Sequence, residues 1–343
     1  MKTVFSEDHA LRDAKTELYG GELVQPFERP SRARYIVDRL RTVELGPILP
    51  PEDHGMDPIL AIHDADFVTF LQEAGEAWAA EGYKGEAIAT CWPARRMVQK
   101  CPSHIDGKLG YYALAAETAI TEGTWKAAYA SAQVALTGAD LVRGGERGAF
   151  ALCRPPGHHA AFDMFGGYCF LNNAAIAAQS MLDHGAKRIA ILDVDFHHGN
   201  GTQDIFYTRD DVFFASLHGA PEEAFPHFLG YADETGTGAG EGFTANYPMP
   251  PDTPFSEWRK ALASALDRIA KYAPDALIVS LGVDTFETDP ISFFKLASPD
   301  FTTYGGDIAD LGLPTLFVME GGYDIDEIGL NTVNVLEGFV GAE

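Results

Sequence analysis

The chain has few cysteines. Four stand among its 343 residues, at positions 91, 101, 153 and 169, and no two of them form a Cys-x-x-Cys pair. This scarcity excludes a disulfide framework and a zinc module built on paired cysteines. Sparse, unpaired thiols are typical of proteins in a reducing compartment, so we expect a cytoplasmic location.

Long hydrophobic runs are missing as well. A membrane-spanning helix needs about 20 consecutive apolar residues, and no stretch of this sequence reaches that length. The first ten residues include Glu7 and Asp8 and lack the apolar centre of a secretory signal. We therefore expect no signal peptide and no membrane partner.

Positive charge is scarce. Lys and Arg number 25 against 50 Asp and Glu, which gives a formal net charge of −25. Such a surface repels phosphate, so we expect no nucleic-acid partner. It attracts small cations, although a plain solvated acidic surface would carry the same charge.

Two common catalytic signatures are also absent. The sequence contains no P-loop and no Gly-x-Ser-x-Gly motif. The glycine-rich run at 236–242 follows no strand-like segment, so we interpret it as a loop and not as a dinucleotide site.

What the sequence does contain is an alternation of helical and strand-like segments. Helical patterns mark four segments, at 113–119, 125–142, 173–184 and 256–272. Apolar runs without polar alternation mark five more, at 148–153, 188–194, 212–217, 275–281 and 314–319. Such runs are typical of strands buried on both faces. The sequence therefore predicts an α/β fold, with a mostly parallel central sheet flanked by helices.

Residues 81–110 differ from the rest of the chain. They mix Gly, Pro, Trp and basic residues and show no clear apolar period. A long ordered loop of this kind is often functional, so we expect a functional insertion here.

Polar side chains follow each of the five apolar runs. They are the histidine pair 158–159, the segment 195–201, His218, Asp284 and the segment 320–323. In parallel α/β sheets the active site lies at the carboxyl ends of the strands. The sequence therefore predicts that these groups converge there.

Three of these residues have the pattern of a metal site. Asp193, Asp195 and His197 stand at alternate positions, so in an extended chain their side chains point the same way. Asp195 and His197 can then reach one ion, with Asp284 as a third ligand. Three protein ligands and an open position are typical of catalytic zinc, and two carboxylates also suit Fe²⁺ or Co²⁺. A metal-free Asp–His network is the alternative.

The tandem histidines and a tyrosine are candidates for the proton chemistry. His158 and His159 follow a stiff Pro-Pro-Gly turn, and imidazole titrates near neutral pH. Asp193 and Asn200 can hold the two rings in one tautomer. Tyr323 follows two glycines, and its phenol can donate to a developing oxyanion, unless it is simply a core tyrosine.

Several motifs together resemble a known family. RPPGHH, FGGYCFLNN, ILDVDFHHGNGTQ, SLGVDTFETDP and MEGGY are similar to the core shared by histone deacetylases and acetylpolyamine amidohydrolases. The resemblance implies one deacetylase domain over residues 1–343, with the arginase–deacetylase fold. It also implies a zinc-dependent amidohydrolase.

The resemblance assigns roles to the candidate residues. Asp195, His197 and Asp284 would bind the metal. His159 would be the general base and later the acid, with His158 as its electrostatic partner.

The neighbouring groups also receive roles. Tyr323 would polarise the acetyl carbonyl, and Asp193 would orient His158. Asn200 stands where many histone deacetylases have Asp. A neutral amide in place of a carboxylate would weaken the electrostatic attraction for a proton on His159.

Further sites are implied by the same resemblance. A structural potassium ion would be bound by Asp193, Asp195, His197, Ser216 and Leu217. The substrate tunnel would be formed by Gly167, Tyr168, Phe225 and Ile291.

Within the family, the acetylpolyamine amidohydrolases are the better match. The segments 15–24, 81–110, 110–120, 225–236 and 289–296 resemble that subfamily. The resemblance implies a homodimer in which the insertion 81–110 joins the subunits and narrows the active-site entrance. Asp106 and Glu117 would meet the distal ammonium of the substrate.

The expected reaction is metal-dependent hydrolysis of the acetamide bond of acetylputrescine, acetylcadaverine or acetylspermidine, in polyamine metabolism. The products are acetate and the free amine. A protein lysine deacetylase and a non-enzymatic acidic polyamine-binding protein are the alternatives. An arginase-like ureohydrolase with two manganese ions is disfavoured, because Phe286 stands where a second bridging carboxylate is needed.

Overall fold

The computed structural model describes residues 1–342, and its centre is one parallel sheet of eight strands. In spatial order the strands are β4 (Ile48–Leu49), β1 (Lys2–Val4), β5 (Gly148–Ala151), β10 (Thr315–Met319), β9 (Ala276–Leu281), β6 (Ile189–Asp193), β7 (Val212–Gly219) and β8 (Thr244–Met249). Every neighbouring pair in this sheet is parallel.

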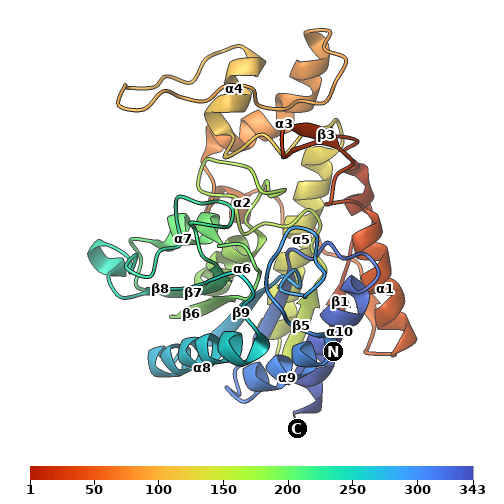
Figure 1. Cartoon of the computed structure of the whole chain (residues 1–343), viewed down its shortest axis with the longest axis vertical. Coiled ribbons are helices and arrows are strands. Elements are labelled where there is room, and N and C mark those ends of the chain that lie inside the picture. Colours follow the sequence, from red (N-terminus) through yellow and green to blue (C-terminus); the bar gives the residue numbers. More distant parts are fainter. Residues whose placement is uncertain (343) are drawn as a thin grey trace.

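Helices cover both faces of this sheet (Figure 1). The strands send alternate residues into two cores, as Ile189 and Ile191 pack on one face and Ala190 and Leu192 on the other. The first core includes residues of α2 (Asp57–Leu60), α3 (Ala65–Ala80), α4 (Ile105–Tyr112), α5 (Thr124–Arg143), α6 (Asn173–Asp183) and α7 (Asn200–Phe206). The second includes residues of α1 (Ser31–Thr42), α8 (Phe255–Tyr272), α9 (Ser298–Ala309) and α10 (Ile328–Gly341).

The predicted fold class is confirmed. All five apolar runs form strands, β5, β6, β7, β9 and β10, and all are buried on both faces. Helices α5, α6 and α8 begin and end within one residue of the predicted segments.

The helix predicted at 113–119 is wrong. This segment is irregular, and Ala113 forms an isolated parallel bridge with Phe165. The side chains of Glu117 and Thr118 accept the backbone N–H groups of Gly167 and Tyr168. Tertiary hydrogen bonds to a neighbouring loop therefore override the local helical pattern.

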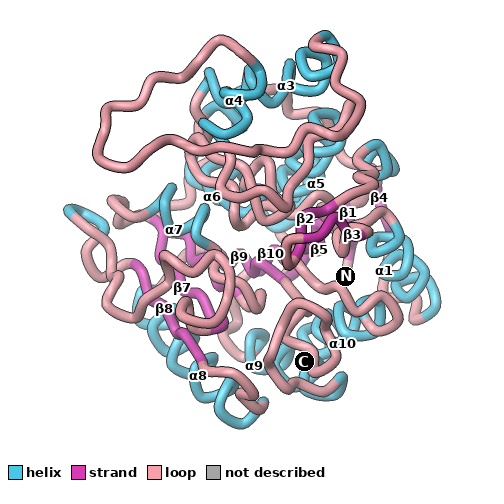
Figure 2. Tube along the Cα trace, turned by 45° about the horizontal axis from the view of Figure 1, so that its top comes forward, coloured by secondary structure: helices cyan, strands magenta, loops and turns pink. Residues whose placement is uncertain are grey.

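The insertion 81–110 lies beside α3, at the end of the molecule away from the sheet (Figures 1 and 2). It is not loop throughout, because α4 begins at Ile105, with the His104 ring accepting the backbone N–H of Asp106. Its middle exposes apolar side chains, and Met97 and Val98 are 73% and 94% exposed.

The remaining elements, several of them long helices, have no counterpart in the predicted segments. These are strands β1, β4 and β8, the antiparallel pair β2 (Glu17–Tyr19) and β3 (Glu22–Val24), helices α1, α2, α3, α4, α7, α9 and α10, and the 3₁₀ turns η1 (Glu7–Leu11) and η2 (Gly238–Gly240). None of the helices in residues 1–342 is long and apolar enough to cross a membrane.

The order of the strands decides where the site forms. The five strands β5, β10, β9, β6 and β7 are consecutive neighbours in the sheet. All run in the same direction, so their carboxyl ends lie along one edge. The polar groups that follow them are thereby gathered in one place.

Candidate metal centre and active site

The side chains of Asp195, His197 and Asp284 meet beyond the carboxyl ends of β6 and β9. Nδ1 of His197 lies 3.3 Å from Oδ1 of Asp195 and 3.0 Å from Oδ2 of Asp284. One donor atom of each residue lies within 4.8 Å of the donors of the other two, and all three residues are buried. Two carboxylates and one imidazole form a donor set that suits zinc or a similar divalent cation.

The backbone shapes the space around these donors. The N–H of Phe196 donates to Oδ1 of Asp284 at 2.8 Å, and the N–H of Gly321 donates to Oδ2 of Asp195 at 2.8 Å. A Cβ on Gly282 would lie 2.0 Å from Oδ2 of Asp195, and one on Gly321 would lie 2.5 Å from Oδ2 of Asp284. Larger residues at these two positions would therefore displace the donor atoms.

The charges of the cluster also suit a cation. Burial and the charge of Asp195 raise the pKa of Asp284 to about 6. Burial opposes a charge on His197, but hydrogen bonds to Asp195 and Asp284 outweigh it and raise the pKa to about 10. Two buried carboxylates this close need a positive charge between them, which a proton on His197 or a divalent cation can supply.

The tandem histidines lie beside this cluster and have different partners. Nδ1 of His158 lies 3.0 Å from Oδ2 of Asp193, and Nδ1 of His159 lies 2.6 Å from Oδ1 of Asn200. The two rings are 4.0 Å apart between centroids, and both residues are buried. Each imidazole is thus oriented by its own acceptor.

The two imidazoles differ in charge. Burial opposes a charge on His158, but the carboxylates of Asp195 and Asp193 outweigh it and raise the pKa to about 10. Burial and the charges of His158 and His197 hold the pKa of His159 well below its usual 6.5. At neutral pH only His159 can therefore accept a proton.

Tyr323 follows β10 and faces the same space. Its backbone N–H donates to Oδ2 of Asp289 at 2.7 Å, and the guanidinium of Arg32 lies over its ring at 4.8 Å from the centroid. Burial raises the pKa of Tyr323 well above 10. The phenol keeps its proton and can donate a hydrogen bond to an oxyanion.

A cavity of about 480 Å³ opens over these groups. Its lining includes His159, His197 and Tyr323. Other lining residues come from β2 and its turn, from the loops around Glu117 and Gly167, and from the loops after β6, β7 and β9: Glu17, Leu18, Tyr19, Gly20, Glu117, Gly167, Tyr168, Phe196, Glu223, Ala224, Phe225, His227, Pro290, Ile291, Ser292 and Phe293.

Aromatic side chains form two walls of this cavity. Phe225 meets the ring of His159 edge to face at 5.1 Å, and the hydroxyl of Tyr168 donates to Oε1 of Glu17 at 2.6 Å. Gly167 has φ +54°, and a Cβ there would lie 2.1 Å from Cδ2 of His159. Only glycine allows the backbone to approach His159 this closely.

Of the six predicted substrate-binding residues, five line the cavity and one does not. Glu117, Gly167, Tyr168, Phe225 and Ile291 are in its lining. Asp106 lies in the first turn of α4, outside the lining of the cavity in a single chain.

The residues predicted to bind potassium lie on β6 and β7 and in the segment that follows β6. Asp193 and Ser216 are register partners on the neighbouring strands β6 and β7, and Leu217 follows Ser216. Asp195 and His197 come directly after β6. Oγ of Ser216 lies 2.9 Å from Nδ1 of His218.

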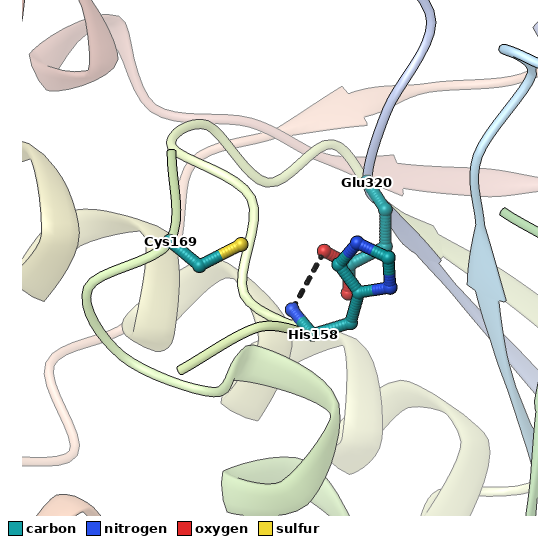
Figure 3. Close-up of side chains that lie close together, drawn as sticks. All are labelled: His158, Cys169 and Glu320. Atoms are coloured by element: carbon teal, nitrogen blue, oxygen red, sulfur yellow. Dashed lines mark hydrogen bonds between the residues drawn. The ribbon is translucent and has the colours of Figure 1, made fainter. Parts of the chain in front are cut away.

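A second group with metal-ligand atoms lies next to the first, formed by His158, Cys169 and Glu320 (Figure 3). Nδ1 of His158 is hydrogen-bonded to Asp193, and its Nε2 lies 3.8 Å from Oδ1 of Asp195. Burial raises the pKa of the Cys169 thiol well above 9, so the sulfur would have to lose a proton to bind a metal. Together with the hydrogen bond of His158 to Asp193, this favours Asp195, His197 and Asp284 as the metal site.

Several residues at the site had no predicted role. Glu17 and Glu223 line the cavity. The side chains of Asp289, Glu320 and Arg32 form hydrogen bonds with backbone atoms next to the reacting groups. Glu17 and Glu320 fall within segments that carried the family resemblance, and Asp289 opens another. Their partners are distant in sequence, so no local sequence pattern could predict their roles.

Comparison with known proteins agrees with this geometry. Residues 26–339 match the family model of the histone deacetylase domain. The chain is 62% identical over 323 residues to an acetylpolyamine amidohydrolase of Mycoplana ramosa, covering 94% of this chain and 95% of that protein. It is 56% identical over 344 residues to acetylpolyamine amidohydrolase 1 of Pseudomonas aeruginosa, covering 100% and 99%.

A solved structure has nearly the same fold. The crystal structure of an acetylpolyamine aminohydrolase from Burkholderia pseudomallei superposes with a TM-score of 0.95 at 38% sequence identity. The match covers 100% of this chain and 99% of that one. The predicted family is confirmed: the chain belongs to the histone deacetylase domain family, in which its high-identity relatives are acetylpolyamine amidohydrolases.

Proposed function

We propose that this protein is a metal-dependent amidohydrolase that removes the acetyl group from small acetylated polyamines. One observation carries the proposal. The imidazoles of His159 and His197 and the phenol of Tyr323 line one cavity. Asp195 and Asp284 lie beside it, with donor atoms within 4.8 Å of that of His197. The names of the close relatives support the same substrate class.

The charge of the cavity supports a cationic substrate. Three carboxylates are in its lining, from Glu17, Glu117 and Glu223, and the lining contains no Lys or Arg. An ammonium group is attracted to such a wall, and the rings of Tyr168 and Phe225 suit a slender methylene chain.

The metal site fits a divalent cation, and we propose zinc, with Fe²⁺ and Co²⁺ as alternatives. Asp195, His197 and Asp284 would hold it, in the space that Gly282 and Gly321 leave open. When bound, such an ion would supply Lewis acidity, which polarises a carbonyl and lowers the pKa of water toward roughly 7.

The residues of the chain then move the protons. Nε2 of His159 takes a proton from the attacking water, because Nδ1 of the same ring is occupied by Asn200. The hydroxyl of Tyr323 donates a hydrogen bond to the oxyanion that develops on the acetyl carbonyl. His159 next gives its proton to the departing amine, which leaves acetate and the free amine. The charged ring of His158 stabilises the developing anion nearby.

We also propose the structural potassium ion at the ends of β6 and β7. Asp193, Asp195, His197, Ser216 and Leu217 would bind it, and the register pairing of Asp193 with Ser216 supports the site. Elemental analysis of the purified protein tests both ions, with about one divalent cation and one potassium expected per chain.

The substrate class can be tested with a panel of acetylated amines. We expect kcat/KM for acetylputrescine, acetylcadaverine or an acetylspermidine to exceed that for acetyl-lysine peptides at least about tenfold, or ~1.4 kcal/mol. The panel is run on zinc-loaded protein and on chelated protein. Equal or better hydrolysis of the peptides would favour the protein lysine deacetylase instead.

The same panel distinguishes the amidohydrolase from a polyamine-binding protein and from a ureohydrolase. A non-enzymatic polyamine-binding protein would bind amine in both samples and release no acetate from either. A ureohydrolase would release urea from a guanidino substrate and would need a carboxylate near Asp284, where the chain has Phe286.

We further propose that the insertion 81–110 forms a homodimer contact and narrows the active-site entrance of the assembled enzyme. Exposed apolar side chains on it support this, since Met97 and Val98 are 73% and 94% exposed. Asp106 of the same segment would then reach a substrate only in the dimer.

The four cysteines, all unpaired in the structure, support a cytoplasmic location.

Charges placed on this surface should separate the subunits. We expect Met97→Asp with Val98→Asp to convert a dimer into a monomer in size-exclusion chromatography with light scattering, because two buried unpaired charges oppose association. Leu60→Asp, on an exposed apolar residue of α2, is the matched control and should remain dimeric. A monomeric wild-type protein would contradict this proposal.

A further inference from the structure

Glu320 connects two segments that carry reacting groups. It follows β10 directly and is fully buried. Its Oε2 accepts the backbone N–H of Gly157 at 2.6 Å and that of His158 at 3.1 Å. Figure 3 shows the main-chain nitrogen of His158 directed at this carboxylate. The residue after β10 thus binds the turn after β5.

The other carboxylate oxygen of Glu320, Oε1, forms no hydrogen bond that would stabilise the fold within residues 1–342. Burial raises the pKa of Glu320 to about 7, although the charge of His158 and the N–H of Gly157 oppose this shift. A buried polar atom without a partner costs free energy. Stability alone therefore gives little reason for an acid at this position.

The loop that follows Glu320 is fixed at further points. Nη2 and Nε of Arg32 donate to the carbonyl oxygens of Glu320 and Gly322 at 2.6 and 2.7 Å. The N–H of Tyr323 donates to Asp289 at 2.7 Å. The loop is therefore rigid, and the Glu320 side chain transmits its position to the turn that carries His158 and His159.

We propose that Glu320 is a positioning residue that sets the placement of His159 relative to Tyr323 by holding the Gly157–His158 backbone. The inference rests on the hydrolysis proposed above. Glu320 does not line the cavity, so it touches no substrate. Its loss should lower kcat and leave KM nearly unchanged, because the reacting groups move while the cavity walls remain.

Three substitutions test this role. Glu320→Gln keeps an oxygen that can accept both N–H groups, so kcat should stay within about threefold of wild type. Glu320→Asp keeps the acid but is too short to reach the turn, and Glu320→Ala removes the acceptor. For these two variants we expect kcat to fall about 10- to 100-fold, the loss expected when a reacting group such as His159 is displaced by about 1 Å. KM should change less than about threefold.

The controls separate positioning from folding. Val333→Ala, in the buried face of α10, lowers the melting temperature without touching the site and should keep wild-type kcat. Metal content of each variant is measured and should match wild type. The role is overturned if Asp and Ala variants keep wild-type kcat, or if Gln loses as much as Ala. If the wild-type protein hydrolyses no acetylated amine, the proposed function fails and not only this inference.

Discussion

Replacing Asp195 with alanine is expected to lower kcat/KM for acetylputrescine by at least about 10³-fold, or ~4 kcal/mol. Asp195 supplies one of three donors within 4.8 Å, and its Oδ2 also accepts the N–H of Gly321. Its loss removes a metal ligand and leaves the charges of His158 and His197 less compensated. Steady-state kinetics and metal content measured on one preparation check the effect.

Chelation of the wild-type protein should have a similar effect and should be reversed by zinc. Asp267→Ala is the matched control, because Asp267 is exposed on α8 and, within residues 1–342, forms an ion pair with Lys271 alone. It should keep wild-type kinetics and metal content. A chelated sample that hydrolyses amides as fast as before would disprove the metal-dependent mechanism.

Tyr323→Phe should lower kcat roughly 10²- to 10³-fold, or ~2.7–4 kcal/mol, as removal of an oxyanion donor does elsewhere. The ring would keep its packing against Tyr168, at 5.5 Å between centroids, and under the Arg32 guanidinium. Only the hydroxyl is lost, so KM and melting temperature should change little. Kinetics over a range of substrate concentrations separate kcat from KM.

A second buried tyrosine provides the control. The hydroxyl of Tyr304 has no hydrogen-bond partner among residues 1–342, and its ring packs between Trp258 and Phe301 in the core. Tyr304→Phe removes the same atom and should leave kcat unchanged. Full activity in Tyr323→Phe would show that the carbonyl is polarised without this phenol.

Much of the central sheet could be predicted from the sequence. Five long apolar runs became strands, because strands buried on both faces carry continuous hydrophobic residues. Short strands such as β1 and β4 could not be predicted, since two or three residues carry no periodicity. The segment 113–119 had a helical composition, yet its polar side chains bind the neighbouring loop instead.

The candidate site was predictable where its residues are close in sequence. Asp193, Asp195 and His197 are recognisable by their alternate spacing, and the histidine pair by its stiff turn. Asp284 was also predictable, because it follows an apolar run as the other site residues do. Contacts of side chains outside that pattern were not predictable. Glu17 meets Tyr168, and Glu320 meets Gly157, only because the sheet brings their segments together.

The sequence by itself determined the chemical groups, the family and the class of fold. Motif residues and apolar periodicity are local properties, which a single chain displays before it folds. The tertiary structure alone decided that β5, β10, β9, β6 and β7 lie side by side, and that acidic residues from separate loops share one cavity. The physical reason is that strand order depends on packing between segments that are distant in sequence. A local pattern of apolar and polar residues does not encode which of these segments pack together.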